Sequence, residues 1–236
     1  MRNKIISISR KAVITAVFIG FWGTGGLKGE YEKMNDIIKL PEPVIKGEIS
    51  LEQAIYTRHS VRSYSNKPLT LEDVSQLLWA AGGERVDAVT SASRTYPSAG
   101  ACYPLEFYLV VGKVEGIEPG LYYYQADRHA LKSMIKGELR NTLTHEGYSQ
   151  SVIKNAPATV VVTAIYPKTT KKYGKRGEKY VSMDSGYSGE NIYLMAAARG
   201  LGTVAVGAFN EMGIKRVLRL HDNEVPVCLY PVGYPR

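Results

Sequence analysis

The stretch of sequence that decides the fold, Thr95–Val111, reads TYPSAGACYPLEFYLVV. Its second half, residues 105–111, is rich in branched and aromatic side chains and predicts a buried β-strand. Its first half, residues 97–101, sets small residues side by side, which lets a backbone approach a flat ligand closely. An ordinary loop explains these letters equally well. Two further segments, residues 58–62 upstream and residues 200–207 downstream, shift the balance towards a ligand wall.

The composition is that of a soluble globular protein, and the length allows one well-filled domain or at most two small ones. The chain has 236 residues, of which 44% are hydrophobic and 22% are charged, and this balance excludes wholesale disorder. The net charge is +8 at pH 7, and basic residues crowd most densely in residues 168–179. Such a run predicts a solvated surface loop, and without a recognition motif we expect no nucleic-acid partner. An anionic small ligand accounts for the surplus charge at least as well.

Cysteine and histidine usage indicates no metal site. The two cysteines, Cys102 and Cys228, lack metal-type spacing, and the four histidines are scattered along the chain. Both cysteines stand among apolar residues and are expected to be small core residues. In an exported protein they could instead form a disulfide, and the sequence leaves this alternative open.

The N-terminus differs in character from the rest of the chain. Residues 1–28 combine a basic start, an apolar run at Ala12–Trp22 and a glycine-rich end, which is the layout of a secretory signal or a short anchor. The run is too short to cross a bilayer of about 30 Å comfortably as a helix, and a helix packed on the domain is the alternative. Residues 29–47 are expected to form a linker and residues 48–236 the folded domain. The protein is thus expected to be exported or membrane-anchored through residues 1–28, and otherwise cytoplasmic.

The remaining pattern mixes helices and strands without strict alternation, which predicts an α+β fold. A capping box at Ser50–Gln53 starts the first helix, and Thr70 starts a second helix that ends at Gly82. One long helix, residues 178–199, is apolar on more than one side, which places it in the middle of the domain or at a subunit interface. Further helices are expected at 138–147 and 211–219, and strands at 105–111, 121–124, 130–135, 158–166, 203–209 and 225–232.

Arg58, Ser60 and Arg62 form the candidate anion site. Two guanidinium forks and a hydroxyl at one helix end suit a phosphate dianion, since charge-assisted hydrogen bonds contribute about 1.5–3 kcal/mol each. The alternative is a solvated helix end whose basic residues merely suit the helix dipole. The sequence has no P-loop, and Gly200-Leu-Gly202 follows a helix instead of opening one, so it is not a dinucleotide-binding turn. A bound phosphate would therefore be held by side chains.

Taken in order, these motifs resemble the FMN-dependent nitroreductase superfamily, and most closely its SagB-type dehydrogenase branch. The resemblance spans about residues 56–235. It rests on RHSVR at 58–62, RTYPSAGACYPLE at 94–106, KYG at 172–174, DSGYSGEN at 184–191, GLG at 200–202, VG at 206–207 and PVGYP at 231–235. One such motif is weak, but the ordered set is specific.

The resemblance implies a nitroreductase-like fold, in which helices surround a mixed, mainly antiparallel sheet, and a homodimer with two FMN molecules at the subunit interface. The long helix would lie in that interface. Arg58, Ser60 and Arg62 would hold the flavin phosphate, together with Arg236 near the chain end. Residues 97–100 would line the flavin, and residues 205–207 would lie near its isoalloxazine edge. The implied cofactor-binding residues are Arg58, His59, Ser60, Arg62, Pro97, Ser98, Ala99, Gly100, Asn191, Ala205, Val206, Gly207 and Arg236.

The same resemblance implies catalysis by Lys172 and Tyr173, with the lysine acting as a base once a closed site lowers its pKa. Two exposed loop residues are the alternative. Tyr187 stands where many relatives carry histidine, which argues against proton transfer at that position. The implied activity is hydride transfer through the flavin. Reduction of a nitro or quinone compound by NAD(P)H competes with dehydrogenation of an azoline or peptide, and a non-catalytic flavin-binding subunit of a larger complex is the alternative from another class.

Overall fold

The structure is a computed structural model that describes residues 37–85 and 93–236. The predicted signal-like segment, residues 1–28, lies outside the described residues. The first part of the predicted linker, residues 29–36, lies outside them as well.

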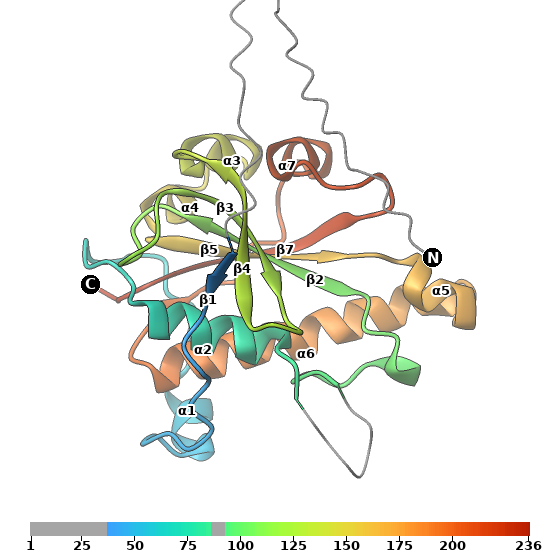
Figure 1. Ribbon diagram of the computed structural model, residues 1–236, viewed down its shortest axis with the longest axis horizontal. Coiled ribbons are helices and arrows are strands. Elements are labelled where there is room, and N and C mark those ends of the chain that lie inside the picture. Colours follow the sequence, from blue (N-terminus) through green and yellow to red (C-terminus); the bar gives the residue numbers. More distant parts are fainter. Residues whose placement is uncertain (1–36, 86–92) are drawn as a thin grey trace, which may run out of the picture. The chain divides into compact units, whose positions relative to one another are not determined.

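A seven-stranded sheet forms the centre of the described chain, with the strand order β1-β4-β3-β2-β5-β7-β6 (Figure 1). All neighbouring strands in it are antiparallel, and isolated parallel bridges join Ser60 to Thr203 and Leu69 to Val114. The expectation of a mainly antiparallel sheet is confirmed, and among the described residues parallel pairing occurs only at these isolated bridges. The strands are β1 (Ile37–Lys39), β2 (Leu105–Val111), β3 (Gly120–Gln125), β4 (Ala130–Lys136), β5 (Ala158–Ala164), β6 (Gly202–Thr203) and β7 (Val225–Gly233).

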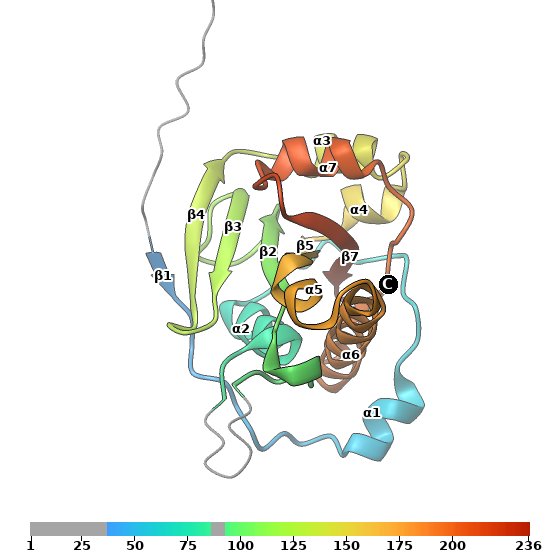
Figure 2. The same ribbon diagram turned by 90° about the vertical axis from the view of Figure 1, so that its right-hand side faces the viewer.

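Helices cover both faces of this sheet, which confirms the expected α+β fold (Figures 1 and 2). On one face lie α2 (Leu71–Gly82) and the long α6 (Arg176–Ala198), and on the other lie α3 (Arg140–Glu146), α4 (Ser151–Asn155) and α7 (Glu211–Leu218). The short helices α1 (Leu51–Thr57) and α5 (Pro167–Tyr173) both contact α6. In the part of the chain that the structure describes, no helix has the length and apolarity that a membrane crossing requires.

Strand β2 shows how alternating side chains build two cores. Leu105, Phe107 and Leu109 belong to the core shared with α2 and α6, whereas Tyr108 and Val110 belong to the core shared with α3, α4 and α7. Because successive side chains of a strand point to opposite faces, a strand covered on both faces is apolar at nearly every position. Strand β5, which pairs with β2 along its full length, has the same character. The two predicted buried strands are thus confirmed at the centre of the sheet.

The basic run at residues 168–179 is helical, so the prediction of a loop was wrong. Helix α5 begins with Pro167, whose fixed φ suits the first position of a helix, and ends before Gly174 at φ +59°. Helix α6 then starts at Arg176. Lysine is a good helix former when its head group reaches solvent. The charge of the run therefore indicated exposure correctly but not backbone structure.

The predicted strand 203–209 is also wrong over most of its length. Only Gly202–Thr203 forms a strand, and an isolated bridge follows between Val206 and Leu229. The amide of Ala205 donates to the Tyr193 hydroxyl at 2.8 Å. This side-chain partner takes the place of the backbone carbonyl that a continuous strand would supply.

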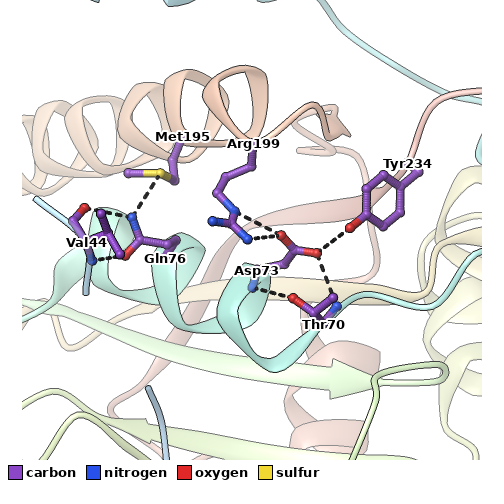
Figure 3. A network of polar contacts seen from close by, with 7 residues as sticks. All are labelled: Val44, Thr70, Asp73, Gln76, Met195, Arg199 and Tyr234. Carbon is purple, nitrogen blue, oxygen red and sulfur yellow. Dashed lines mark hydrogen bonds and ion pairs between the residues drawn. The ribbon is translucent and has the colours of Figure 1, made fainter. Parts of the chain in front are cut away.

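A buried carboxylate, Asp73, ties the start of α2 to the end of α6 and to the C-terminal segment (Figure 3). It completes a capping box with Thr70 and accepts hydrogen bonds from Arg199 Nη2 at 2.6 Å and from the Tyr234 hydroxyl at 2.7 Å. Burial alone would raise the pKa of this carboxyl, but the bonds from Tyr234 and Arg199 outweigh burial and hold the pKa below its ordinary value of 3.8. The fold therefore stabilises the charged form of Asp73.

We predict that Asp73→Asn lowers the free energy of unfolding by about 1–3 kcal/mol at neutral pH, because Arg199 loses its charged partner. A carboxyl with a depressed pKa contributes stability above its pKa in the unfolded chain, and this contribution disappears as the pH falls through the folded value. The deficit of the variant should therefore vanish at strongly acidic pH. Urea unfolding of flavin-free protein across this range measures it. Glu72→Gln, an exposed neighbour on the same helical turn, is the control, and an equal loss there would contradict the prediction.

Candidate functional site

The small-residue turn Pro97–Cys102 is fixed by a contact with α6. It contains a single 3-10 turn in which Gly100 has φ +59°, a left-handed conformation that favours glycine. The Ser98 hydroxyl donates to Asp184 Oδ2 at 2.6 Å and accepts from the Tyr103 amide at 3.0 Å. The turn therefore has a defined shape, held from both sides of Ser98.

Asp184 is the residue of α6 that holds this turn, and its side chain is buried. Burial raises the pKa of its carboxyl, and the hydrogen bonds from Ser98 and from the Ala99 amide only reduce that rise. In the described residues it has no ion-pair partner. Sequence reasoning gave Asp184 no role beyond its place in the DSGYSGEN motif, since helical spacing does not show which segment, here 86 residues earlier, a side chain will meet.

Lys172 and Tyr173, at the end of α5, lie directly against the same turn. The Lys172 ammonium donates to the Gly100 carbonyl at 3.3 Å across 72 residues of sequence. A Cβ atom at Gly100 would overlap the Tyr173 hydroxyl and the Lys172 ammonium, so this close approach requires glycine. The structure thus brings the predicted catalytic pair to the predicted flavin wall, and the pair is not part of an unattached loop.

The position of α5 is set by Glu106, at the second residue of β2. One carboxylate oxygen lies 2.5 Å from Lys168 Nζ, and the other accepts from the Tyr123 hydroxyl at 2.7 Å. Lys168 lies one helical turn before Lys172, so this contact fixes the helix that carries the predicted pair. The sequence motif included Glu106, but it gave no indication of this partner.

A hollow of about 360 Å³ opens between the turn and α6, a size typical of sites for small molecules. Part of its polar wall is the Ser98–Asp184 pair, whose side chains already form a hydrogen bond with each other. Two large side chains of α6, Met183 and Tyr187, remain about half exposed beside it. The lining residues are Pro97, Ser98, Ala99, Tyr180, Met183, Asp184 and Tyr187.

A second group of predicted residues gathers around Tyr193, further along α6. The Tyr193 hydroxyl lies 3.1 Å from Ser60 Oγ and accepts from the Ala205 amide at 2.8 Å. The Arg58 guanidinium lies 5.8 Å from the centre of the Tyr193 ring, and its Nε is 3.2 Å from Glu190 Oε1. Tyr193 and Glu190 were not predicted as site residues. The only local signal is that they lie on the same face of the helix, three residues apart.

The three predicted arginines do not share one hollow of this chain. Arg58 lines a cavity of about 200 Å³ beside α6. Arg62 and Arg236 line a different one, of about 390 Å³. Within a single chain, the convergence of guanidinium groups expected from the sequence is therefore divided between two places.

The remaining predicted residues have local partners. His59 is exposed, with ring nitrogen Nδ1 3.0 Å from the Thr57 carbonyl oxygen. The Asn191 amide donates to the Thr95 carbonyl at 3.2 Å, which ties α6 to the segment before the turn. Residues 206–207 continue from Ala205, the first buried and the second exposed.

Cysteines and metal-type side chains form no further centre in the described ranges. There, no group of three or more His, Cys, Asp or Glu side chains is placed to hold a metal ion. Cys102 and Cys228 are both free thiols, so the disulfide that the sequence left open is absent. Burial raises the pKa of the Cys228 thiol, as expected for a core cysteine.

Comparison with known proteins identifies the family. The family model described as "Nitroreductase family" matches residues 55–234, a range that includes both groups of site residues. The chain belongs to the nitroreductase family. The resemblance seen in the sequence and the fold that it implied are thereby confirmed.

Individual nitroreductase-family proteins are similar over most of the chain. A protein of Methanocaldococcus jannaschii classed as a nitroreductase is 41% identical over 200 residues, covering 85% of this chain and 98% of that protein. One of Archaeoglobus fulgidus, classed as an NADH dehydrogenase or NAD(P)H nitroreductase, is 27% identical and covers 77% and 83%. A crystal structure from Ralstonia eutropha, also classed as a nitroreductase, superposes with a TM-score of 0.74 at 29% identity, covering 88% and 92%.

A shorter match is to a protein named for the processing of trifolitoxin. Trifolitoxin-processing protein TfxB of Rhizobium leguminosarum bv. trifolii is 28% identical over 132 residues. The match covers 54% of this chain and 35% of TfxB.

We predict that Asp184 and Asp73 give opposite pH dependences. A carboxyl with a raised folded pKa contributes stability that is fully present below its pKa in the unfolded chain and is lost as the pH rises through the folded value. The stability of the wild type relative to Asp184→Asn should therefore fall from acidic to neutral pH, whereas relative to Asp73→Asn it should rise. Chemical unfolding of both variants measures the two slopes. Parallel slopes would show that Asp184 is not held in an environment that penalises its charge.

Proposed function

We propose that this nitroreductase-family protein is an FMN-dependent oxidoreductase that transfers hydride through a bound flavin. Members of the family are generally FMN-dependent oxidoreductases. The observation that carries the proposal is the contact of Lys172 and Tyr173 with the turn at Gly100. It supports a site in which a cation and a hydroxyl stand at the wall that is expected to face the flavin.

The residues around Tyr193 fit a flavin phosphate. Arg58 offers a guanidinium fork and Ser60 a hydroxyl, and both residues are exposed to an incoming ligand. The ion pair between Arg58 and Glu190 is solvated, with 39% and 50% of the two side chains exposed, so it is weak. A phosphate dianion would replace Glu190 as the partner of Arg58 at little cost.

We propose that the flavin site is completed in a homodimer. The turn at residues 97–100 meets α6 at Asp184, whereas Arg58 and Ser60 meet it further along, at Tyr193. A second copy would supply the missing half of each site. Helix α1 supports this assembly, because it exposes apolar side chains, with Tyr56 91% exposed, and an open hollow of about 400 Å³ lies between α1 and α6.

When bound, the flavin would supply the hydride acceptor and donor of the reaction. The chain's own residues supply position and protons. Ser98 and Asp184 hold the wall of the hollow rigid, and Met183 and Tyr187 would exclude water from a substrate lying beside it. The Lys172 ammonium and the Tyr173 hydroxyl would hold or move a proton on that substrate.

NAD(P)H is the proposed electron donor, on the strength of the name of the Archaeoglobus fulgidus relative. For the acceptor, a small nitro or quinone compound competes with a SagB-type substrate, an azoline or peptide. The azoline or peptide substrate is supported by the Lys172–Tyr173 pair and by the match to the trifolitoxin-processing protein. Steady-state assays with NADPH and either nitrofurazone or menadione separate the two classes. Bound flavin with no turnover on any acceptor, together with co-purifying proteins, would favour the non-catalytic subunit.

The location of the enzyme remains a proposal that rests on residues 1–28. These would export the domain or anchor it, and otherwise the protein is cytoplasmic. An anchor that leaves the domain inside the cell agrees with a nicotinamide donor, because NAD(P)H is cytoplasmic. Cell fractionation and sequencing of the mature N-terminus distinguish these outcomes.

We predict that the purified protein is yellow and that Arg58→Ala with Arg62→Ala removes the flavin without unfolding the chain. Each lost charge-assisted hydrogen bond weakens binding by about tenfold or more. Arg58→Ala alone should weaken flavin binding more than Arg62→Ala alone, since of these two arginines only Arg58 lies with Ser60 beside Tyr193. Flavin absorbance after gel filtration measures retention, and circular dichroism checks the fold. Full flavin retention in the double variant would refute the assigned phosphate site.

We predict that Lys172→Met lowers turnover by about 10²–10⁴-fold, the contribution typical of a general acid or base, while flavin binding is unchanged. Lys171→Met removes the neighbouring exposed charge of the same helix and is the matched control. It should retain turnover close to wild type. Steady-state kinetics with flavin content measured in parallel tests this, and equal losses in the two variants would leave Lys172 without a catalytic role.

A further inference from the structure

An extended segment, residues 37–44, joins the edge of the sheet to α2, and we call it the N-terminal strap. Its first part is β1, which pairs with β4 at the edge of the sheet (Figure 2). Beyond β1, the Leu40 amide donates to the His129 carbonyl at 3.0 Å. The Val44 amide and carbonyl bond to the Gln76 side chain on α2, at 2.8 and 3.0 Å (Figure 3). The domain thus holds the strap mainly through its backbone.

The strap buries little apolar surface. Leu40 is its one buried side chain, whereas Ile37 and Val44 are 50% and 57% exposed. Segments with few buried apolar contacts open more easily than the core of a domain does. The polar contacts of the strap therefore decide whether it stays in place.

His129, in the turn between β3 and β4, makes the polar contact at the centre of the strap. Its Nε2 lies 3.0 Å from the Pro41 carbonyl oxygen and 2.7 Å from Ser75 Oγ, and the serine hydroxyl donates to the same carbonyl at 2.6 Å. Its Nδ1 lies 2.8 Å from the Tyr124 hydroxyl. His129 has φ +45°, a left-handed conformation that is uncommon outside glycine and is kept only where surrounding contacts enforce it.

The partners of the two ring nitrogens require a neutral imidazole. A carbonyl oxygen only accepts, so we assign the ring hydrogen to Nε2, which faces Pro41. Nδ1 is then the acceptor for the Tyr124 hydroxyl, which is buried and forms no other hydrogen bond in the described residues. Protonation would place a second hydrogen on Nδ1 and leave the tyrosine hydrogen without an acceptor. A buried donor in that position destabilises the contact.

Burial acts in the same direction as this geometry. It lowers the pKa of His129 below its ordinary value of 6.5, and the bond to the Pro41 carbonyl and the charge of Glu42 offset only part of the effect.

The charged groups beside the ring are present as pairs of opposite sign. From α2 the ring meets Ser75, which carries no charge, and from β3 it meets Tyr124. The hollow next to it is lined by ionisable side chains of the strap, of the turn and of the segment after α2, and each of these lies within 4 Å of an opposite charge. The pairs are Lys39 with Glu42, Arg128 with Asp127, and Arg94 with Glu84. Histidine is the side-chain type that ordinarily titrates between about pH 5 and 8, so the ring itself is the group that responds there.

We propose that His129 is a pH-sensitive latch, which holds the N-terminal strap while its ring is neutral and releases the strap, with the rest of the domain still folded, when the ring is protonated. Release would uncover the backbone of β4, and a free strand edge can pair with another extended chain. The proposal goes beyond the oxidoreductase activity and does not rest on it.

The direction of the response follows from the lowered pKa of the held ring. A released ring stands in water and titrates at its ordinary value. The contribution of the latch is therefore fully present above that value and is lost as the pH falls through the lower value of the held ring.

Amide hydrogen exchange of the full chain at about pH 7.5 and about pH 5, followed by mass spectrometry, tests this proposal. Protection factors correct for the intrinsic pH dependence of exchange. We expect the protection of residues 37–44 to fall about tenfold or more at the lower pH, because a released histidine is mostly charged there. The central strand β5 should keep its protection, since the domain stays folded.

Three variants separate a latch from an ordinary contact. Ser75→Ala removes one donor to the Pro41 carbonyl and should lower the protection of the strap by a similar factor at both pH values. His129→Gln cannot gain a charge and should abolish the pH response. His221→Gln removes an exposed histidine elsewhere and should keep the full response.

Unchanged protection of the strap at the lower pH, an equal loss of protection in β5, or a pH response that persists in His129→Gln would overturn the proposal. If His129→Gln releases the strap at both pH values, NMR titration of the wild-type ring decides. The signal missing from the variant identifies the ring of His129. Its protonation and the loss of strap protection should share one midpoint, and two separate midpoints would contradict the latch.

Discussion

Helix α6 is the element on which the rest of the described structure depends, because its polar side chains must find partners in other parts of the chain. Asp184 holds the small-residue turn, Tyr193 holds the segment that follows α1, and Arg199, directly after the helix, binds the start of α2. A buried polar group left without a partner costs about 1–3 kcal/mol. Three segments that are far apart in the sequence are therefore held at fixed positions along one helix. The spacing of these contacts sets the geometry of the candidate site.

The two carboxylates that meet this helix system show how the same side chain serves two purposes. Asp73 and Asp184 are equally buried, but Asp73 receives bonds from an arginine and a tyrosine, whereas Asp184 receives them only from a serine hydroxyl and a backbone amide. The first environment favours the charged form and the second penalises it. Asp73 is therefore suited to hold elements together. Asp184 combines a raised pKa with a place in the wall of a hollow, and this combination is more often found at functional sites than in structural contacts.

The features that could be predicted from the sequence are those whose signal is local. Six apolar residues among the seven of Leu105–Val111 identify β2 as a strand covered on both faces, and the long helix extends over more than twenty residues. The two wrong predictions have physical causes of the same kind. The charge of residues 168–179 correctly indicated exposure to water, but charged side chains reach water from a helix as well as from a loop. The apolar letters of 203–209 predicted a strand, but the Tyr193 hydroxyl takes the amide that a strand would need.

The candidate site was predictable only in part, for a related reason. The turn, Arg58, Ser60 and the Lys172–Tyr173 pair could be named because they belong to sequence motifs. Their supporting side chains could not, because those contacts cross long stretches of sequence, as between Glu106 and Lys168, 62 residues apart. Such a partner is chosen by the register of strands and the rotation of helices, which no single segment of sequence specifies.

Basic residues that are neighbours in the sequence are likewise not the ones that gather in the folded chain. The densest basic run, residues 168–179, is wound into α5 and the start of α6, and helix geometry turns successive side chains in different directions. Charges that are close in the sequence are thus spread around the helix. Lys172 makes a specific contact because Gly100 leaves room for it. The hollow of about 390 Å³ that Arg62 lines is built in the opposite way, since Arg62, Lys113 and Lys154 come together there from segments that show no cluster in the sequence. A surplus of charge in the composition therefore indicates that an anion is expected, whereas only the tertiary structure indicates where it would bind.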